Sequence, residues 1–321
     1  MDKKRLVILV LAISIAINLI IGYLFYRDQK EEASLAKANK IVNKVTEKYP
    51  FIARRVALEN PNTNDVIINF LSLRNQLEST VKPWDSDFSF YFEYLPTGTS
   101  VGVNSNTQFF AASLFKVPVI MAYYHYLERT GISRNQEIII EKDDIDSQFG
   151  DLWKKGEGTK ISAMEAIKLA LEQSDNTAAK VIARQVDDQD FNAVYRALDL
   201  DLLTGNGGAL MTTREYGVIL KALYFSAILN KDDSSEILKY LSNSPFNDKL
   251  VAGIPSGVTI SHKIGDYNDS KGNKAFYDCG IVYLPKRPYM LCMSSVGDEN
   301  TANIRMSQIS KIVYDYVSNA K

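Results

Sequence analysis

The chain changes its apolar periodicity twice, and this order of segments limits the folds open to it more than any other sequence feature. Alternating or aromatic-rich segments typical of β-strands lie at residues 88–95, 100–103, 259–263, 275–284 and 289–296. Segments with apolar residues at helical spacing lie at residues 111–129, 163–171, 176–184, 191–198, 213–229 and 303–316. Because strands at both ends enclose a run of helices, we predict an α+β fold whose antiparallel sheet combines N- and C-terminal strands, with helices packed on it.

An apolar run near the N-terminus predicts a membrane anchor. The run extends from Leu6 to Tyr26 and follows Lys3, Lys4 and Arg5. It reaches the roughly 20 residues that a helix needs to cross a bilayer, whereas the apolar core of a signal peptide has about 7–15. We therefore expect residues 6–26 to cross the cell membrane once, with a cytoplasmic N-terminus and an extracytoplasmic remainder. A cleaved signal peptide is the alternative interpretation.

The rest of the chain divides into a charged spacer and a globular domain. We assign residues 1–27 to a cytoplasmic tip and anchor, 28–85 to a helical stalk or N-terminal helical segment, and 86–321 to the main domain. The 37 Lys and Arg residues balance 38 Asp and Glu residues, so no basic surface for nucleic acid is expected. The two cysteines, Cys279 and Cys292, fall on strands joined by a turn at 285–288, where they could form a disulfide or stay as two buried thiols.

Ser113 and Lys116 form the first candidate for chemistry. At positions i and i+3 of a helix their side chains lie on one face. A neutral lysine amine can take the proton of a serine hydroxyl, and burial favours the neutral amine. Backbone N–H groups at a helix start can also stabilise an oxyanion. The pair alone is weak, because S-x-x-K also occurs by chance.

Two further polar segments follow in the chain. Ser174-Asp175-Asn176 lies between two helical segments, and Lys263 and Gly265 end an apolar strand. Each segment alone also fits a structural role, as a helix cap or as a strand end with a turn. In this order, S-x-x-K, S-D-N and K-x-G resemble the signature of class A β-lactamases and penicillin-binding proteins.

The resemblance covers residues 88–316, and it is strengthened by similar flanking sequences at 109–112, 210–214 and 278–283. It implies a β-lactamase/transpeptidase-like fold with an all-helical subdomain, and no metal or organic cofactor. It also implies that Ser113 is acylated, that Lys116 is its base or proton relay, and that Ser174 passes a proton to the leaving nitrogen.

The same resemblance implies a set of substrate-binding residues. Asn176 would hold the substrate amide, and Lys263 would orient the substrate carboxylate. Gly265 and Asp266 complete the set, because backbone N–H groups near Asp266 or Tyr267 would form the oxyanion hole together with that of Ser113.

The chain departs from the family pattern at two places. Class A β-lactamases activate the deacylating water with a glutamate, but no Glu-x-x-x-Asn follows S-D-N here. The acids in that stretch are only loose substitutes: Asp187, Asp188, Asp190, Asp199 and Asp201. Ile264 replaces the hydroxyl residue of K-[ST]-G, which removes a hydrogen bond to a charged group worth about 1.5–3 kcal/mol. Asp266 next to it could repel an anionic substrate or pair with a cationic one, or it is an exposed turn residue.

These features leave three functions to compare. The first is a penicillin-binding cell-wall peptidase that acts on D-alanyl-D-alanine in peptidoglycan stem peptides, favoured by the predicted anchor and by the missing glutamate. The second is a β-lactamase with a nonstandard deacylation base. The third is a non-catalytic binding domain, which the intact set of polar residues argues against.

Overall fold

The computed structural model describes residues 18–30, 32–33, 36–37, 48–52, 68–201, 203–205, 208–268 and 272–320. The chain forms two compact units, one of residues 1–50 and 54–61 and the other of residues 51–53 and 62–321. Most of the predicted membrane span at 6–26 therefore lies outside the described residues. Within the described ranges, no helix is both long and apolar enough to cross a membrane.

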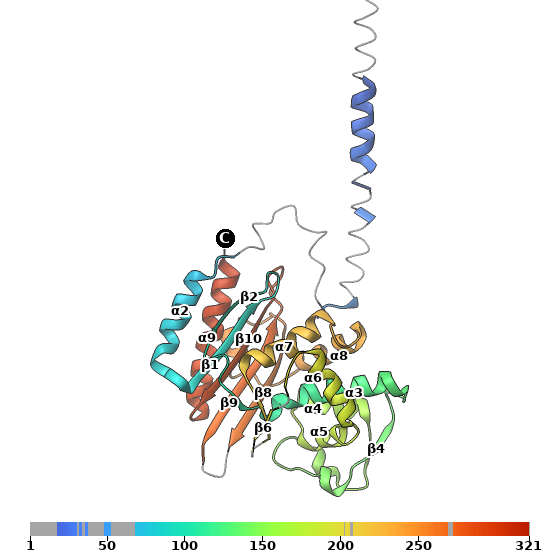
Figure 1. Ribbon diagram of the computed structural model, residues 1–321, viewed down its shortest axis with the longest axis vertical. Helices are drawn as coiled ribbons and strands as arrows, with labels where there is room; N and C mark the ends of the chain where they lie inside the picture. The colour runs from blue at the N-terminus through green and yellow to red at the C-terminus, as the bar shows by residue number, and fades with distance from the viewer. Residues whose placement is uncertain are drawn as a thin grey trace, which may run out of the picture. The chain divides into compact units, whose positions relative to one another are not determined.

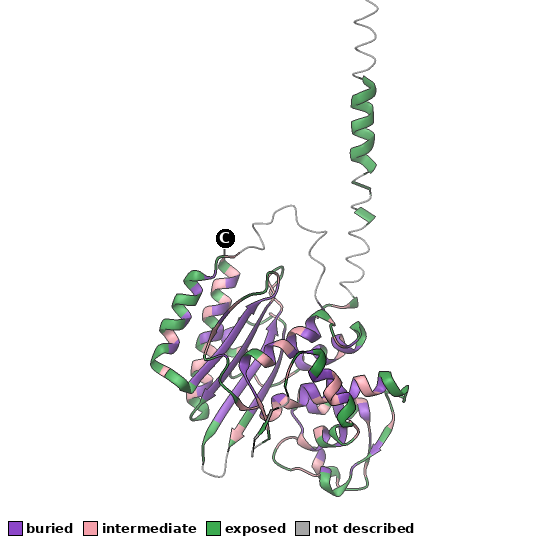
Figure 2. Ribbon diagram, viewed as in Figure 1, coloured by how far each residue is buried: buried purple, intermediate pink, exposed green. Residues whose placement is uncertain are grey.

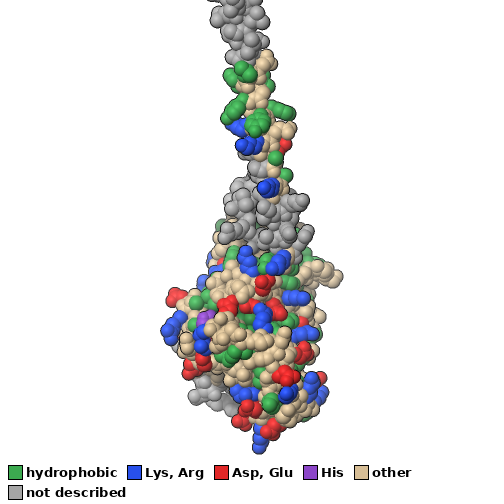
Figure 3. Space-filling model, turned by 90° about the vertical axis from the view of Figure 1, so that its right-hand side faces the viewer, with side chains coloured by type: hydrophobic (Ala, Val, Ile, Leu, Met, Phe, Trp, Pro, Cys, Tyr) green, Lys and Arg blue, Asp and Glu red, His purple; other side chains and the backbone are tan. Residues whose placement is uncertain are grey.

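The described part of the first unit contains a helix over residues 18–30. Its apolar side chains are all exposed, as the green atoms of Figure 3 show, and they are Leu19, Ile20, Ile21, Tyr23, Leu24, Phe25 and Tyr26. Exposure of every large apolar side chain on a helix is unfavourable in water.

The second unit is built on a five-stranded antiparallel sheet with the order β2-β1-β10-β9-β8 (Figure 1). Its strands are β1 (Phe88–Tyr94), β2 (Thr99–Val103), β8 (Ile260–Asn268), β9 (Lys274–Val282) and β10 (Tyr289–Val296). The predicted combination of N- and C-terminal strands is confirmed. The strand predicted at 259–263 is longer, however, because β8 continues to Asn268.

Helices cover both faces of this sheet. On one face lie α2 (Leu71–Val81) and α9 (Glu299–Asn319), and on the other lie α7 (Thr213–Phe225) and α8 (Lys231–Ser242). Side chains alternate between the two faces of β1, so this strand packs against both helical layers. Phe90 and Phe92 join the core beneath α9, while Tyr91 faces α7. The three central strands β1, β10 and β9 are accordingly almost wholly buried (Figure 2). Gly217 of α7 allows a close approach here, since a Cβ would lie 2.7 Å from Met290 Cε and 3.0 Å from the Tyr91 ring.

The remaining helices form the part of the fold that the sequence predicts as all-helical. They are α3 (Lys116–Thr130), α4 (Ala163–Glu172), α5 (Asn176–Ala183) and α6 (Asp188–Ala197). Short 3₁₀ turns are η3 (Lys82–Asp87), η4 (Ala112–Phe115), η5 (Lys142–Asp144), η6 (Leu152–Lys155) and η7 (Val251–Gly253). The all-helical prediction is wrong in one respect, because β4 (Glu137–Ile139) and β5 (Lys160–Ser162) form a two-stranded ladder there.

A third, small ladder lies beside the start of α3. It consists of β3 (Phe109–Phe110), β7 (Gly208–Met211) and β6 (Leu203–Gly205). Its edge holds the backbone that leads into the Ser113 segment, since Ala111 N donates to Ala209 O at 2.8 Å.

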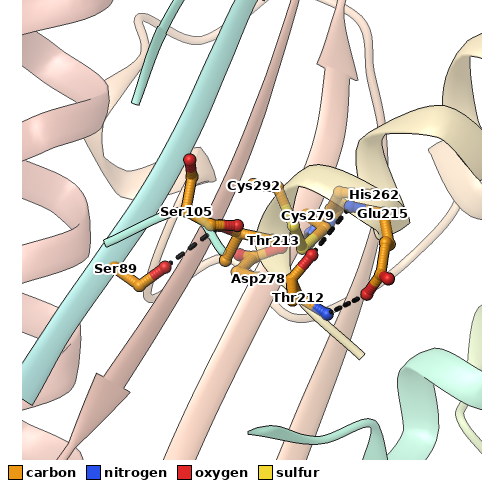
Figure 4. The surroundings of a disulfide bond; sticks show 9 residues. All are labelled: Ser89, Ser105, Thr212, Thr213, Glu215, His262, Asp278, Cys279 and Cys292. Carbon is orange, nitrogen blue, oxygen red and sulfur yellow. Dashed lines mark hydrogen bonds and ion pairs between the residues drawn. A yellow bond between two sulfur atoms is a disulfide. The ribbon is translucent and has the colours of Figure 1, made fainter. Parts of the chain in front are cut away.

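Cys279 and Cys292 form a disulfide, which decides between the two alternatives left open by the sequence (Figure 4). The two cysteines are direct partners in the β9–β10 register, and both are fully buried. His262 lies on the neighbouring strand and contacts Asp278 Oδ1 through Nδ1 at 2.8 Å, as expected for a structural histidine. Both groups are buried, so the pair satisfies two polar side chains inside the sheet layer.

Candidate active site

A cavity of about 600 Å³ lies between β8, η4, the start of α3 and the turn before α5. Six of the seven predicted site residues line it: Ser113, Lys116, Ser174, Asn176, Gly265 and Asp266. The seventh, Lys263, reaches the same place from β8, because its Nζ lies 2.7 Å from Ser174 Oγ. The structure therefore brings together all the residues that the sequence selected from three distant segments.

Ser113 belongs to η4 and not to the α-helix, which corrects the prediction of one helix from Ala111. The α-helix begins at Lys116, and the turn before it starts from Ala112 at φ 45°, in the left-handed region. A non-glycine residue there is strained, and such strain is common where a turn must present a functional side chain. Ser113 is consequently only half-buried and faces the cavity.

Gly265 packs closely against its neighbours, where the sequence allowed a turn. It lies inside β8, opposite Tyr277 in the register with β9. A Cβ at Gly265 would stand 3.4 Å from both Ala111 O and the Leu114 side chain, and 3.1 Å from the Tyr277 ring. The missing side chain thus lets β8 pass directly beside the turn that carries the candidate nucleophile.

The side chain of Lys116 extends from the first turn of α3, and its amine is surrounded by oxygen atoms. Its Nζ donates to the backbone carbonyl of Ser174, to Ser174 Oγ at 3.1 Å and to Asn176 Oδ1 at 2.8 Å. Burial lowers the pKa of Lys116 to about 7, although the charges of Asp175 and Asp146 act in the opposite direction. A substantial fraction of the amine is therefore neutral near pH 7 and can accept a proton.

Lys263 approaches Ser174 from the opposite side. Its Nζ also donates to Ile264 O at 3.1 Å, and only 1% of the residue is exposed. Burial, reinforced by the positive charge of Lys116, lowers the pKa of Lys263 well below its usual value, while Asp266 and Asp278 act to raise it.

Ser174 is the point where the two lysines meet. Its Oγ accepts a hydrogen bond from each of Lys116 and Lys263. Since a hydroxyl oxygen has two lone pairs, these contacts fill its acceptor capacity and leave its own proton to be donated. The geometry can therefore move a proton from Lys116 through Ser174 to a group bound in the cavity.

The backbone of the Ser174 turn is held by its neighbours. Ser174 has φ 57°, and the next residue, Asp175, caps α5 by accepting from Ala178 N at 2.8 Å. The other carboxylate oxygen of Asp175 accepts from Leu152 N, also at 2.8 Å. Gly150 makes room for the Asp175 side chain, because a Cβ at Gly150 would lie 2.2 Å from Asp175 Oδ2. The cap that the sequence suggested for α5 is confirmed, and it also anchors the turn.

Asp146 is a supporting residue that the sequence did not reveal. It accepts from Asn176 Nδ2 at 3.1 Å and pairs with Lys180 at 2.9 Å, which fixes the amide so that Asn176 Oδ1 faces Lys116. Burial alone would raise the pKa of Asp146, but hydrogen bonds from Asn176 and Lys180 outweigh it and lower the pKa. Nothing in the sequence marks this loop acid, since its role depends on where the loop folds.

The five acids between S-D-N and α7 do not line the cavity. Asp190 is instead buried against α3, where it pairs with Arg129 and accepts from His125 Nδ1 at 2.7 Å. The Arg129 hydrogen bond lowers the pKa of Asp190 to about 2. Asp187 caps α6 through Asp190 N and also contacts Arg129. Among the described residues lining the cavity, Asp266 is the one carboxylate.

Other lining residues were not predicted. Gln148 and Phe149 come from the loop before η6, and Asn268 comes from the continuation of β8. Tyr267, which the sequence considered only for its backbone, stacks on Phe110 with ring centroids 4.7 Å apart. The two aromatic rings of Phe149 and Tyr267 give the cavity apolar wall area suited to an organic acyl group.

Comparison with known proteins places this site in context. A family model described as "Beta-lactamase enzyme family" matches residues 72–317. A curated relative from Bacillus subtilis (strain 168), named "Beta-lactamase", is 23% identical over 280 residues, which are 81% of this chain and 88% of the relative.

Two solved structures are similar in fold. A mutant of PBP-A in an acyl-enzyme complex with penicillin G has a TM-score of 0.69 and 23% identity, covering 77% of this chain and 96% of that chain. The TLA-3 extended-spectrum beta-lactamase has a TM-score of 0.70 and 20% identity, covering 78% of this chain and 99% of that chain. At these identities the likeness shows a shared fold.

Proposed function

Because the chain belongs to the β-lactamase enzyme family, we propose that it is an extracytoplasmic serine hydrolase that forms an acyl-enzyme on Ser113. Its substrates are amides of the β-lactam or D-alanyl-D-alanine type, and its role is that of a penicillin-binding cell-wall peptidase. The observation that carries the proposal is the contact of Lys116 and Lys263 with Ser174 Oγ in the cavity that Ser113 faces.

The proposed reaction uses these contacts in sequence. The Ser113 hydroxyl attacks the substrate carbonyl while its proton passes to neutral Lys116, directly or through Ser174. Ser174 then gives a proton to the leaving nitrogen. Asn176 holds the substrate amide, and backbone N–H groups of Ser113 and of β8 after Gly265 stabilise the oxyanion.

Release of the acyl group is the step that separates a peptidase from a β-lactamase. The amine of Lys116 donates to Ser174 and Asn176. Among the described residues, no carboxylate accepts a hydrogen bond from it. A water near the acyl carbonyl therefore lacks the glutamate base of class A β-lactamases, and deacylation of a penicilloyl adduct should be slow. This favours the penicillin-binding peptidase.

A β-lactamase is the second candidate, and the curated relative with that name favours it. It would require another base for deacylation, for which Lys116 with its pKa of about 7 is available. A non-catalytic binding domain is the third candidate. It leaves the buried pair of lysines unexplained, because burying two amines beside each other costs stability unless the arrangement serves a function.

The experiment is to incubate the protein with a fluorescent penicillin and to follow both labelling and its decay. We expect covalent labelling that persists for many minutes and that is absent in Ser113→Ala. Turnover of a chromogenic cephalosporin faster than the decay of the label would instead support the β-lactamase. Absence of both labelling and peptide hydrolysis would contradict catalysis and favour the binding domain.

We also propose that residues 6–26 anchor the protein in the membrane. The composition of this run supports an anchor, and so does the exposure of the apolar side chains on the helix at 18–30. The disulfide suits an oxidising compartment outside the cytoplasm. The full chain should stay with membranes after alkaline extraction, whereas a chain starting at residue 28 should not. Release of the full chain would contradict the anchor.

A further inference from the structure

Asp266 is the one carboxylate among the described residues that line the cavity. Burial raises the pKa of this carboxyl, whereas the positive charges of Lys249 and Lys263 act to lower it. The Asp266 side chain is exposed on β8, and within the described ranges its carboxylate accepts no hydrogen bond and enters no ion pair. The neighbouring cation Lys249 is already engaged, because its amine lies 3.2 Å from an Asp248 oxygen and over the Phe276 ring at 5.8 Å from the ring centroid. A further acid, Glu299 at the start of α9, adds negative charge nearby.

The position of Asp266 places it beside the path of an acyl donor. β8 is an outer strand of the sheet, so it pairs with β9 along one edge and borders the cavity along the other. Gly265 is the point where β8 passes the turn that carries Ser113. A substrate bound along this edge with its carbonyl at Ser113 therefore extends past Asp266, the next residue of the strand.

The other groups at this edge offer little to an anion. Ile264 shares a strand face with Asp266 and has no hydrogen-bond donor in its side chain. Lys116 and Lys263 direct their amines onto Ser174. Burial also lowers the pKa of both amines, which reduces the positive charge that they present.

We propose that Asp266 ranks acyl donors by charge, so that a donor presenting a positively charged nitrogen to the edge of β8 beyond Gly265 acylates Ser113 faster than a matched donor presenting a carboxylate there. This inference rests on the acyl-enzyme function proposed above and adds a charge preference among its acyl donors. It makes Asp266 the residue that determines specificity, separate from the groups that move protons.

The test uses three thioesters that share a phenylacetylglycyl group and differ in the thiol that leaves. The thiols are thiocholine, which is cationic, 2-methoxyethanethiol, which is neutral, and thioglycolate, which is anionic. In each reaction the bond between Ser113 Oγ and the acyl carbon forms, the C–S bond breaks, and the thiol leaves with the proton from Ser113. Intact-mass measurement of the acylated protein and the release of thiol give the acylation rate.

We expect the cationic donor to react fastest and the anionic donor slowest, with a ratio of about tenfold at low salt. The ratio should fall as salt is added, because the side chain is exposed. Asp266→Asn should bring the ratio close to one, because the amide keeps the size of the side chain without its charge, and circular dichroism checks that the variant is folded. The matched control is Asp143→Asn, which removes an exposed acid outside the cavity lining and should keep the ratio.

Two results overturn the inference in distinguishable ways. If the donors acylate Ser113 without a preference for the cation, or if Asp266→Asn leaves the preference intact, the charge selection is wrong and the acyl-enzyme function stands. If neither the thioesters nor penicillin acylates Ser113 in the unmodified protein, the proposed function is wrong and the inference falls with it.

Discussion

Replacing Lys116 with methionine is expected to slow acylation of Ser113 by about a thousandfold, the typical contribution of a general base. Methionine keeps the length and apolar stem of the side chain but cannot accept the serine proton. The Nζ contacts to Ser174 and Asn176 are lost with it, so the proton path is interrupted at its first step. The measurement is the second-order rate of labelling by a fluorescent penicillin.

The pH dependence of the same rate separates a base from a purely structural lysine. Burial places the pKa of Lys116 at about 7, and only the unprotonated amine can accept a proton. The rate of the unmodified protein should therefore fall as pH drops below about 7 and level off above it. In Lys116→Met this inflection should disappear. Lys168→Met, an exposed lysine of α4 away from the cavity, is the control and should keep both rate and profile. A Lys116→Met rate within tenfold of the unmodified protein would contradict the assigned role.

Replacing Asp175 with alanine is expected to lower the free energy of unfolding by about 2–4 kcal/mol, through a lost helix cap and a buried N–H left without an acceptor. The side chain is buried and accepts from the backbone N–H groups of Ala178 and Leu152. Because Ser174 holds a left-handed backbone beside it, release of the turn should also slow acylation. Chemical denaturation and penicillin labelling measure the two effects.

The control for this variant is another helix cap far from the cavity. Asp298 caps α9 through Thr301 N at 3.0 Å but is exposed, so Asp298→Ala should cost only about 1 kcal/mol and leave the labelling rate unchanged. Equal losses of stability in the two variants, with no change in labelling for Asp175→Ala, would show that the cap does not position Ser174.

The order of strands and helices could be predicted from the sequence, because the spacing of apolar residues within each segment depends only on that segment. The motif residues could also be grouped, since a resemblance links S-x-x-K, S-D-N and K-x-G to one site. The end of β8 was predicted wrongly because Gly265 and Asp266 resemble a turn in isolation. The strand nevertheless continues to Asn268, and Gly265 packs beside Ala111 and Leu114, which no local pattern reveals.

Other features depended on contacts between distant segments. Helix α8 was missed because its first turn is polar, although Asn230 followed by acids is a capping signal that could have revealed it. The disulfide between Cys279 and Cys292 required the strand register, which a turn of uncertain length leaves open. Asp146 gained its role only when its loop met Asn176.

The most direct test of the central claim is to identify the acylated residue. Protein treated with penicillin should gain the mass of one adduct, and peptide mapping should place it on Ser113, with no adduct in Ser113→Ala. An adduct on another residue, or an unmodified Ser113 in protein that remains folded and turns over substrate, would contradict the account.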